Sequence, residues 1–147
     1  MRDGFGGILN IVFIVIFLLI VEGVLGLVVN YTKAFKMKNN VISMIEQYEA
    51  TGCFENTGNS ACVKRIIDKA KEIGYSPTSL NCPSGYDSVY DLFCYRGEIV
   101  KNTDNYTSSK PTVYKVVTQV DLNLPLISNI LGFSIFQVSG DTEVVES

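Results

Sequence analysis

Glu22 has the most unusual setting of any ionisable residue in this chain, because it is a lone carboxylate inside the apolar stretch FLLIVEGVLGL (residues 17–27). A charge at the centre of a bilayer costs about 2.5–3.5 kcal/mol, and such groups usually face a protein partner. Gly23 and Gly26 permit close helix contact, and Asn10 adds a second polar position. We therefore predict a helix-packing site at these four residues. Snorkelling of Glu22 to the nearby interface is the alternative.

The four cysteines are Cys53, Cys62, Cys82 and Cys94, and their spacing contains no CxxC. A zinc site of four thiolates is therefore weakly supported, and no metal site is predicted. Of the three possible pairings, we favour Cys53–Cys62 with Cys82–Cys94, because each closes a short loop. Both would staple irregular segments that lack a large core. In a cytoplasmic domain, the alternative is four free thiols.

Little in the sequence supports catalysis. Histidine is absent, which excludes Ser-His-Asp and Cys-His catalysis and imidazole general bases. Asp87 and Asp91 are a possible carboxylate pair, although solvated surface acids are the commoner explanation. The GFGG at residues 4–7 lacks the lysine and spacing of a phosphate loop. With a net charge of −3 and no basic cluster, no nucleic-acid partner is expected. We predict no catalytic residue, no cofactor and no enzymatic activity.

The element that carries Glu22 is predicted to be a transmembrane helix. No charged residue occurs between Gly4 and Val21, and the apolar run resumes after Glu22. About 20 apolar residues cross a bilayer as a helix, so we predict a single span over 8–30 after a short leader-like segment, 1–7. A cleaved signal should have a shorter apolar region and a small-x-small site. A buried helix in a soluble protein is the other alternative, but the remaining chain is too small to wrap it.

Two signals disagree about orientation. Lys33, Lys36 and Lys38 follow the span whereas only Arg2 precedes it, which by positive-inside counting places the rest of the chain in the cytoplasm. An even set of cysteines in a small domain instead suits an oxidising compartment. Since large domains are translocated largely regardless of nearby charge, we expect residues 31–147 to be an extracytoplasmic domain.

The predicted fold class is α+β, with a long N-terminal helix, a second short helix and a small antiparallel sheet of three or four strands. The first helix should continue through 31–50, with an apolar stripe at Ala34, Met37, Val41, Ile45 and Tyr48 and a stop at Gly52. Two helices hinged at residues 39–40 are the alternative. The second helix should begin after Ser60 and end before Gly74, with an apolar face made of Val63, Ile66, Ile67, Ala70 and Ile73.

The last third of the chain changes to the period of strands. We expect a strand at SVYDLFCY (88–95) that turns at Arg96–Gly97 into a short partner, GEIVK. A long strand is expected at TVYKVVTQVDLNL (112–124) and a compact connection, with a possible helical turn, at PLISNILG (125–132). A final strand is expected at FSIFQVSGDTEVV (133–145), with a break at Gly140. The segments between are predicted loops.

This order of elements resembles the type IV pilin-like subunits, and in more detail the TadE-like pseudopilins, minor subunits of Tad-type pili and related conjugation clusters. The similar stretches are IVEGVLGLVVNYTKAF, IEQYEATG, LPLISNILGF and SGDTEVV. The likeness touches both ends of the chain and leaves the middle unmatched.

The resemblance implies a structural subunit of a bacterial pilus, secretion or conjugation assembly. Such a subunit would be anchored in the cell membrane, contacting lipid and other pilin-like or membrane subunits through its N-terminal helix as part of a larger assembly. Cleavage after Gly6 or Gly7 is implied as well. In the family, a glutamate usually stands five residues into the mature chain, but here Ile11 or Val12 occupies that position. A membrane-anchored binding module for a ligand or partner protein is the alternative function.

Overall fold

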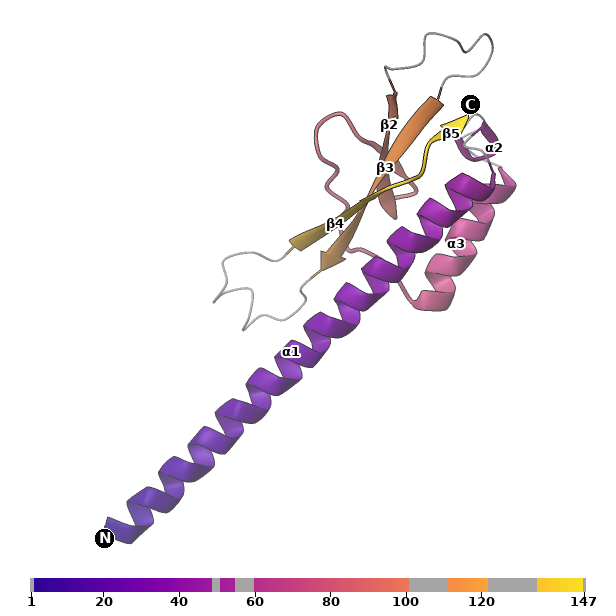
Figure 1. The fold of residues 1–147 in the computed structure, drawn as a ribbon. Coiled ribbons are helices and arrows are strands. Elements are labelled where there is room, and N and C mark those ends of the chain that lie inside the picture. The colour runs from indigo at the N-terminus through magenta and orange to yellow at the C-terminus, as the bar shows by residue number, and fades with distance from the viewer. Residues whose placement is uncertain (1, 49–50, 55–59, 101–110, 122–134, 147) are drawn as a thin grey trace.

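The computed structural model describes residues 2–48, 51–54, 60–100, 111–121 and 135–146, and it has the predicted α+β architecture. The helices are α1 (Arg2–Gln47), α2 (Thr51–Phe54) and α3 (Ala61–Ile73), and the strands are β1 (Asp87–Val89), β2 (Phe93–Ile99), β3 (Pro111–Asp121), β4 (Ile135–Asp141) and β5 (Val145–Glu146). Figure 1 shows that α1 is a long stalk whose second half carries the whole domain, with the N-terminus at the far end.

Helix α1 is continuous over 46 residues, so the hinge considered at residues 39–40 does not form. Its helical structure begins at Arg2 and includes the segment expected to be a separate leader. It ends at Gln47, and the last two residues of the expected helix, 49–50, lie outside the described residues. The predicted stop at Gly52 is wrong, because this glycine lies inside α2.

The second half of α1 buries the predicted stripe. Ala34, Met37, Val41 and Ile45 are fully buried, and Tyr48 is half-buried. Positions three and four residues apart share one face of a helix, and this face packs against α3 and the sheet. The first half of α1 has the same regular backbone, but it has no domain around it (Figure 1).

Helix α3 has the predicted boundaries. The Ser60 hydroxyl accepts from the Val63 N–H at 3.2 Å, which is a helix N-cap. Gly74 has a φ of 68°, the left-handed conformation that ends many helices and that glycine adopts without strain. The predicted apolar face is buried at Val63, Ile66 and Ala70 and half-buried at Ile67 and Ile73. The alternation of charged and apolar residues in this helix therefore predicted its packing correctly.

The sheet has the antiparallel order β1-β2-β3-β4, and the short β5 pairs with β3 beyond the end of β4. The longest strand, β3, pairs with β2 from Cys94↔Val117 to Ile99↔Thr112. On its other edge it pairs with β4 from Lys115↔Asp141 to Asp121↔Ile135. Several predicted segments lie outside the described residues. They are the connection at 125–132, residues 102–110 of the loop expected at 102–111, and residues 122–124 and 133–134 of the expected strands.

The first hairpin turns at a different place from the one predicted. Tyr90 and Asp91 both have positive φ, 49° and 53°, and the Leu92 N–H donates to the Val89 carbonyl at 3.0 Å. Two consecutive positive φ values match the twist of a tight hairpin, but a tyrosine rarely adopts one. Little in the sequence therefore predicts this turn, and the expected turn at Arg96–Gly97 is wrong.

Two glycines expected to interrupt strands instead allow close packing. Gly97 lies inside β2 opposite Tyr114, where an added Cβ would stand 3.2 Å from the tyrosine ring. Gly140 lies inside β4, where an added Cβ would stand 3.0 Å from the side chains of Lys38 and Ile42 on α1. The last strand breaks after Asp141 instead, and its pairing with β3 resumes at β5.

Strand β3 is covered on both faces over its second half. Val116, Thr118 and Val120 alternate with Val117 and Gln119, and all five side chains are buried. The Thr118 hydroxyl donates to the Ala34 carbonyl of α1 at 3.0 Å, which fixes the first set against the helix. The second set lies on the opposite face of the strand, because successive side chains alternate across a sheet.

The buried stripe of α1 predicts a large effect for substitution of Met37. Met37→Ala removes a fully buried side chain between α1 and the sheet, and such changes cost about 2–5 kcal/mol. Val144→Ala, at an exposed site after β4, should change stability by less than about 0.5 kcal/mol. Urea unfolding of the full chain in detergent measures both. Equal midpoints for the two variants would contradict the packing described for α1.

Candidate functional site

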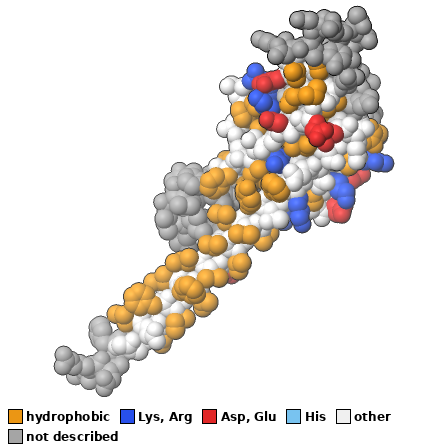
Figure 2. Space-filling view, in the orientation of Figure 1, with side chains coloured by type: hydrophobic (Ala, Val, Ile, Leu, Met, Phe, Trp, Pro, Cys, Tyr) orange, Lys and Arg blue, Asp and Glu red, His pale blue; other side chains and the backbone are white. Residues whose placement is uncertain are grey.

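The first half of α1 is the largest apolar surface in the described part of the chain. Here α1 is long and apolar enough to span a membrane, with a mean hydropathy of 3.1 in its most apolar window. Figure 2 shows this surface as a stalk of apolar side chains below a domain that carries charged groups. Its exposed large side chains are Ile8, Leu9, Ile11, Val12, Phe13, Ile14, Val15, Ile16, Phe17, Leu18, Leu19, Ile20, Val21, Val24, Leu25, Val28 and Val29.

Two glycines of the stalk, Gly23 and Gly26, continue the stripe that packs the domain. Gly23, Gly26 and Asn30 are spaced by three and four residues, and the same spacing leads on to Ala34 and Met37. Residues so spaced lie on one face of a helix. Gly23 is buried and Gly26 is half-buried, because larger neighbours stand around them. One face of α1 therefore runs from the apolar half into the domain core without interruption.

The structure brings together some, but not all, of the predicted packing residues. Glu22 is exposed, and it lies about 40° around the helix from Gly26, on the edge of the small-residue face. Asn10 is also exposed, but it lies more than three turns below Glu22 and faces a different side. Gly6 and Gly7 are exposed in the first turns of α1, with nothing near an added Cβ. Cleavage there stays a prediction.

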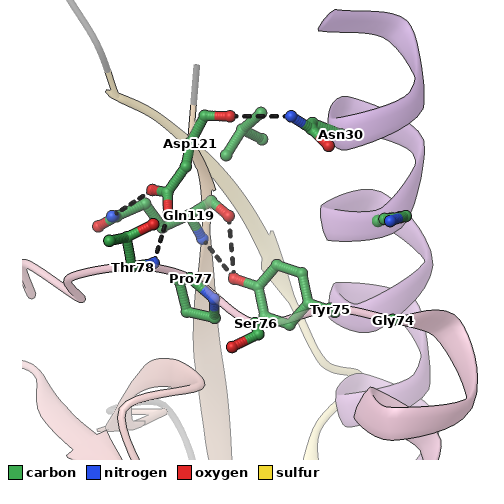
Figure 3. Close-up of a pocket in the computed structure, with 10 residues that line it drawn as sticks. Asn30, Gly74, Tyr75, Ser76, Pro77, Thr78, Gln119 and Asp121 are labelled. Carbon is green, nitrogen blue, oxygen red and sulfur yellow. Dashed lines mark hydrogen bonds between the residues drawn. The ribbon is translucent and has the colours of Figure 1, made fainter. Parts of the chain in front are cut away.

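Where the stalk meets the domain, α1 is tied to the end of β3. The Asn30 side-chain amide donates to the Asp121 carbonyl at 3.0 Å. Asn30, Lys33 and the segment from Gly74 to Thr78 line a small polar pocket of about 220 Å³ with the last residues of β3 (Figure 3). This tie fixes the height of the sheet along α1 at the level where the apolar segment ends.

Tyr75 takes the place of a missing strand beside β3. Toward the C-terminal end of β3, the last residue that pairs with β2 is Val117, opposite Cys94. Two residues on, the Gln119 N–H donates to the Tyr75 hydroxyl, and that hydroxyl donates to the Gln119 carbonyl, both at 2.9 Å (Figure 3). Burial raises the pKa of Tyr75 to about 12, against a weaker opposing effect of its hydrogen bond to Gln119. The neutral hydroxyl can then act as donor and acceptor together.

The side chains of Gln119 and Asp121 hold the segment after Tyr75 against β3. The Gln119 amide donates to Asp121 at 2.8 Å and to the Ser79 carbonyl, and its oxygen accepts from the Asn81 N–H at 3.0 Å. The Thr78 N–H donates to the Asp121 carboxylate. Partial burial acts to raise the pKa of Asp121, but the hydrogen bonds from Gln119 and Thr78 outweigh it and hold the pKa below its usual value.

Sequence reasoning did not identify this polar junction. In the sequence, Asn30 is the last residue of the predicted span, and Tyr75 is the residue after a helix-ending glycine. Their partners lie far away along the chain, 91 residues from Asn30 and 44 residues from Tyr75. Only the strand register brings these residues together, and no local pattern contains that register.

Both disulfides form in the predicted pairing. Cys53–Cys62 joins α2 to the start of α3, and Cys82–Cys94 joins the segment after Tyr75 to β2. The second disulfide therefore holds the segment after Tyr75, which the Gln119 side chain also binds. Free cysteines are absent from the described residues, and no group of three or more potential metal ligands occurs among them.

A second hollow, of about 560 Å³, lies beside the first disulfide. Phe54, Tyr90 and Tyr95 line it together with Asp87, and the Phe54 and Tyr95 rings stack at 4.0 Å. Asp87 is on β1 and Asp91 is in the turn; both are exposed. No hydrogen bond connects these two carboxylates within the described residues.

No family model, no curated protein and no solved structure matches this chain.

The polar junction predicts a stability effect for Tyr75→Phe. The substitution keeps the ring but leaves the Gln119 N–H and carbonyl without their partner, at a cost of about 1–3 kcal/mol. Tyr48→Phe is the matched control, because it keeps the ring over which Arg65 lies and should cost little. Urea unfolding at neutral pH measures both variants. A Tyr75→Phe midpoint equal to that of the control would contradict the role given to this hydroxyl.

The same residue predicts an alkaline loss of stability. An unfolded tyrosine loses its proton near its ordinary pKa of 10.0, whereas burial holds the folded pKa of Tyr75 at about 12. The unfolded state therefore binds fewer protons between these values, so this contribution is complete below pH 10 and is lost as the pH approaches 12. Wild type should lose stability more steeply than Tyr75→Phe across that window. Parallel curves would count against the shifted pKa.

Proposed function

We propose that this protein is a non-enzymatic, single-pass, pilin-like structural subunit of a bacterial envelope assembly. The observation that carries the proposal is the face of α1 that runs from Gly23 and Gly26 into the buried stripe of the domain. A helix partner that packs on the small-residue face would then lie directly below the sheet. A cleaved signal segment would not need such continuity with a domain core.

The position of the domain outside the membrane is supported by the cysteines. Two disulfides in a small domain suit an oxidising compartment. The opposing signal came from the lysines after the span, and packing accounts for two of them. The Lys38 ammonium lies 4.4 Å from the centre of the Phe35 ring, and the Lys33 ammonium lies beside Gly74 at the end of α3. The positive charges of Lys33 and Lys38 therefore have packing contacts that do not depend on which side of the membrane the domain occupies.

The resemblance to TadE-like pseudopilins supports the same reading of the architecture. The family combines a half-membrane, half-amphipathic helix with a small sheet domain, and this chain has that order. The usual carboxylate of the mature N-terminus is replaced by Ile11 or Val12. Glu22, much deeper along the helix, would then be the polar contact to a partner helix or to a partner's amine, since a charge in the span usually faces protein.

The hollow beside Cys53–Cys62 favours a second candidate function, an anchored binding module. Its aromatic lining and one carboxylate, Asp87, could hold a ligand or a segment of a partner protein. Such a module would need α1 only as an anchor. Substitutions on the small-residue face would then leave its function intact.

Photo-crosslinking within the membrane tests the proposed helix contact. A benzophenone amino acid at Leu27, beside Gly26, should give a discrete protein adduct in native membranes. Gly26→Leu should reduce the adduct about tenfold or more, because the added side chain would separate helices that pack at small residues. Glu22→Gln should also weaken it.

Val21→Phe is the control, because it adds bulk about 140° around the helix from Gly26 and should leave the adduct unchanged. A lipid-only product at Leu27, or an adduct that survives Gly26→Leu, would contradict the packing proposal. Binding of a ligand or partner protein by the domain, without any helix adduct, would favour the binding module.

A further inference from the structure

A hollow of about 480 Å³ lies between α1 and the end of α3, at the foot of the domain. Its lining has two parts. Val28, Val29 and Ile73 give an apolar floor, and Lys33 and Lys36 stand on α1 just above it. Thr32 and Glu72 complete the lining. An apolar floor beneath two cations is complementary to a group that is itself apolar at one end and anionic at the other.

The level of this hollow matches the membrane surface expected for the proposed anchor. Val28 and Val29 are the last exposed aliphatic residues of the apolar stalk. With a rise of about 1.5 Å per residue, Lys33 lies about 6 Å and Lys36 about 10 Å above Val29 along the helix axis. Lipid headgroups occupy a layer of similar depth next to the hydrocarbon core. The backbone of Lys33 therefore lies at the depth of the headgroup layer, and that of Lys36 lies at its outer edge, where a long side chain can extend back to the lipid phosphates.

The cations of the hollow are not neutralised by neighbouring carboxylates in the described structure. Glu72 is held by Lys69 at 2.6 Å, on its own helix. Neither Lys33 nor Lys36 takes part in an ion pair among the described residues. Lys33 is half-buried beside the C-terminal turn of α3, which limits its movement, whereas Lys36 is exposed. An anion that enters the hollow would meet both charges.

We propose that this hollow binds the phosphate of an anionic phospholipid from the leaflet next to the domain. Lys33 and Lys36 contact the phosphate, and Val28, Val29 and Ile73 contact the first carbons of an acyl chain. The bound lipid fills the space between α1 and α3, and it fixes the height of the domain above the bilayer. This inference rests on the proposed membrane anchor, but not on any protein partner.

Native mass spectrometry of the full chain in detergent tests the proposal with phosphatidylglycerol as the probe. Wild type should retain one phosphatidylglycerol in preference to phosphatidylcholine. Removal of a juxtamembrane lysine weakens such binding by about fivefold, so Lys33→Gln and Lys36→Gln should each lose that much and the double variant about thirtyfold. Lys36→Arg, which keeps the charge, should restore most of the binding.

Lys64→Gln is the matched control, since it removes one exposed lysine from the opposite end of α3. Equal lipid retention by this control and by the Lys33→Gln/Lys36→Gln variant would overturn the proposal. Binding of glycerol phosphate without acyl chains as strongly as the lipid would also overturn it. Resistance of the protein to carbonate extraction distinguishes failure of the membrane anchor from failure of the lipid site. A protein that carbonate extracts would refute the anchor itself. A resistant protein without lipid preference would refute only the lipid site.

Discussion

The packing of β3 against the second half of α1 is the contact on which the rest of the structure depends. Ala34 is small enough for the Thr118 hydroxyl to reach its carbonyl at 3.0 Å, and Gly140 lets the neighbouring strand approach the same helix. Around this contact, the disulfide Cys82–Cys94 holds the segment after Tyr75 against the sheet, and the hydroxyl of Tyr75 binds the edge of β3 beyond the end of its pairing with β2. The stability of the domain is therefore tied to a helix that continues into the apolar stalk.

Much of this arrangement followed from local patterns in the sequence. The apolar stripe of α1, the capping residues of α3 and the pairing of the cysteines each depend on neighbours close in sequence, where spacing is informative. The turn at Tyr90–Asp91 and the packing roles of Gly97 and Gly140 were missed. Each follows from strand register or from contact with a distant element, and a glycine alone does not distinguish a turn from a close approach.

The candidate site likewise has residues that the sequence predicted and residues that it did not. The position of Glu22 and the glycines on the apolar helix was visible in the sequence, because charge and hydropathy are properties of single residues. The junction of Asn30 and Tyr75 with the end of β3 was not, since it joins residues 91 and 44 positions apart. This junction sets the sheet at a fixed height above the apolar segment. A partner bound to the stalk would consequently have a defined position relative to the domain.

The proposed membrane-anchored chain carries an oxidised extracytoplasmic domain, and the best test of this arrangement is the intact mass of the membrane-extracted protein. We expect no alkylation before reduction and four alkylated cysteines after it, from the two disulfides. The same spectrum gives the N-terminus and so decides cleavage after Gly6 or Gly7. Four cysteines alkylated without reductant would contradict the extracytoplasmic position and would place the domain in the cytoplasm, as the lysines after the span predict.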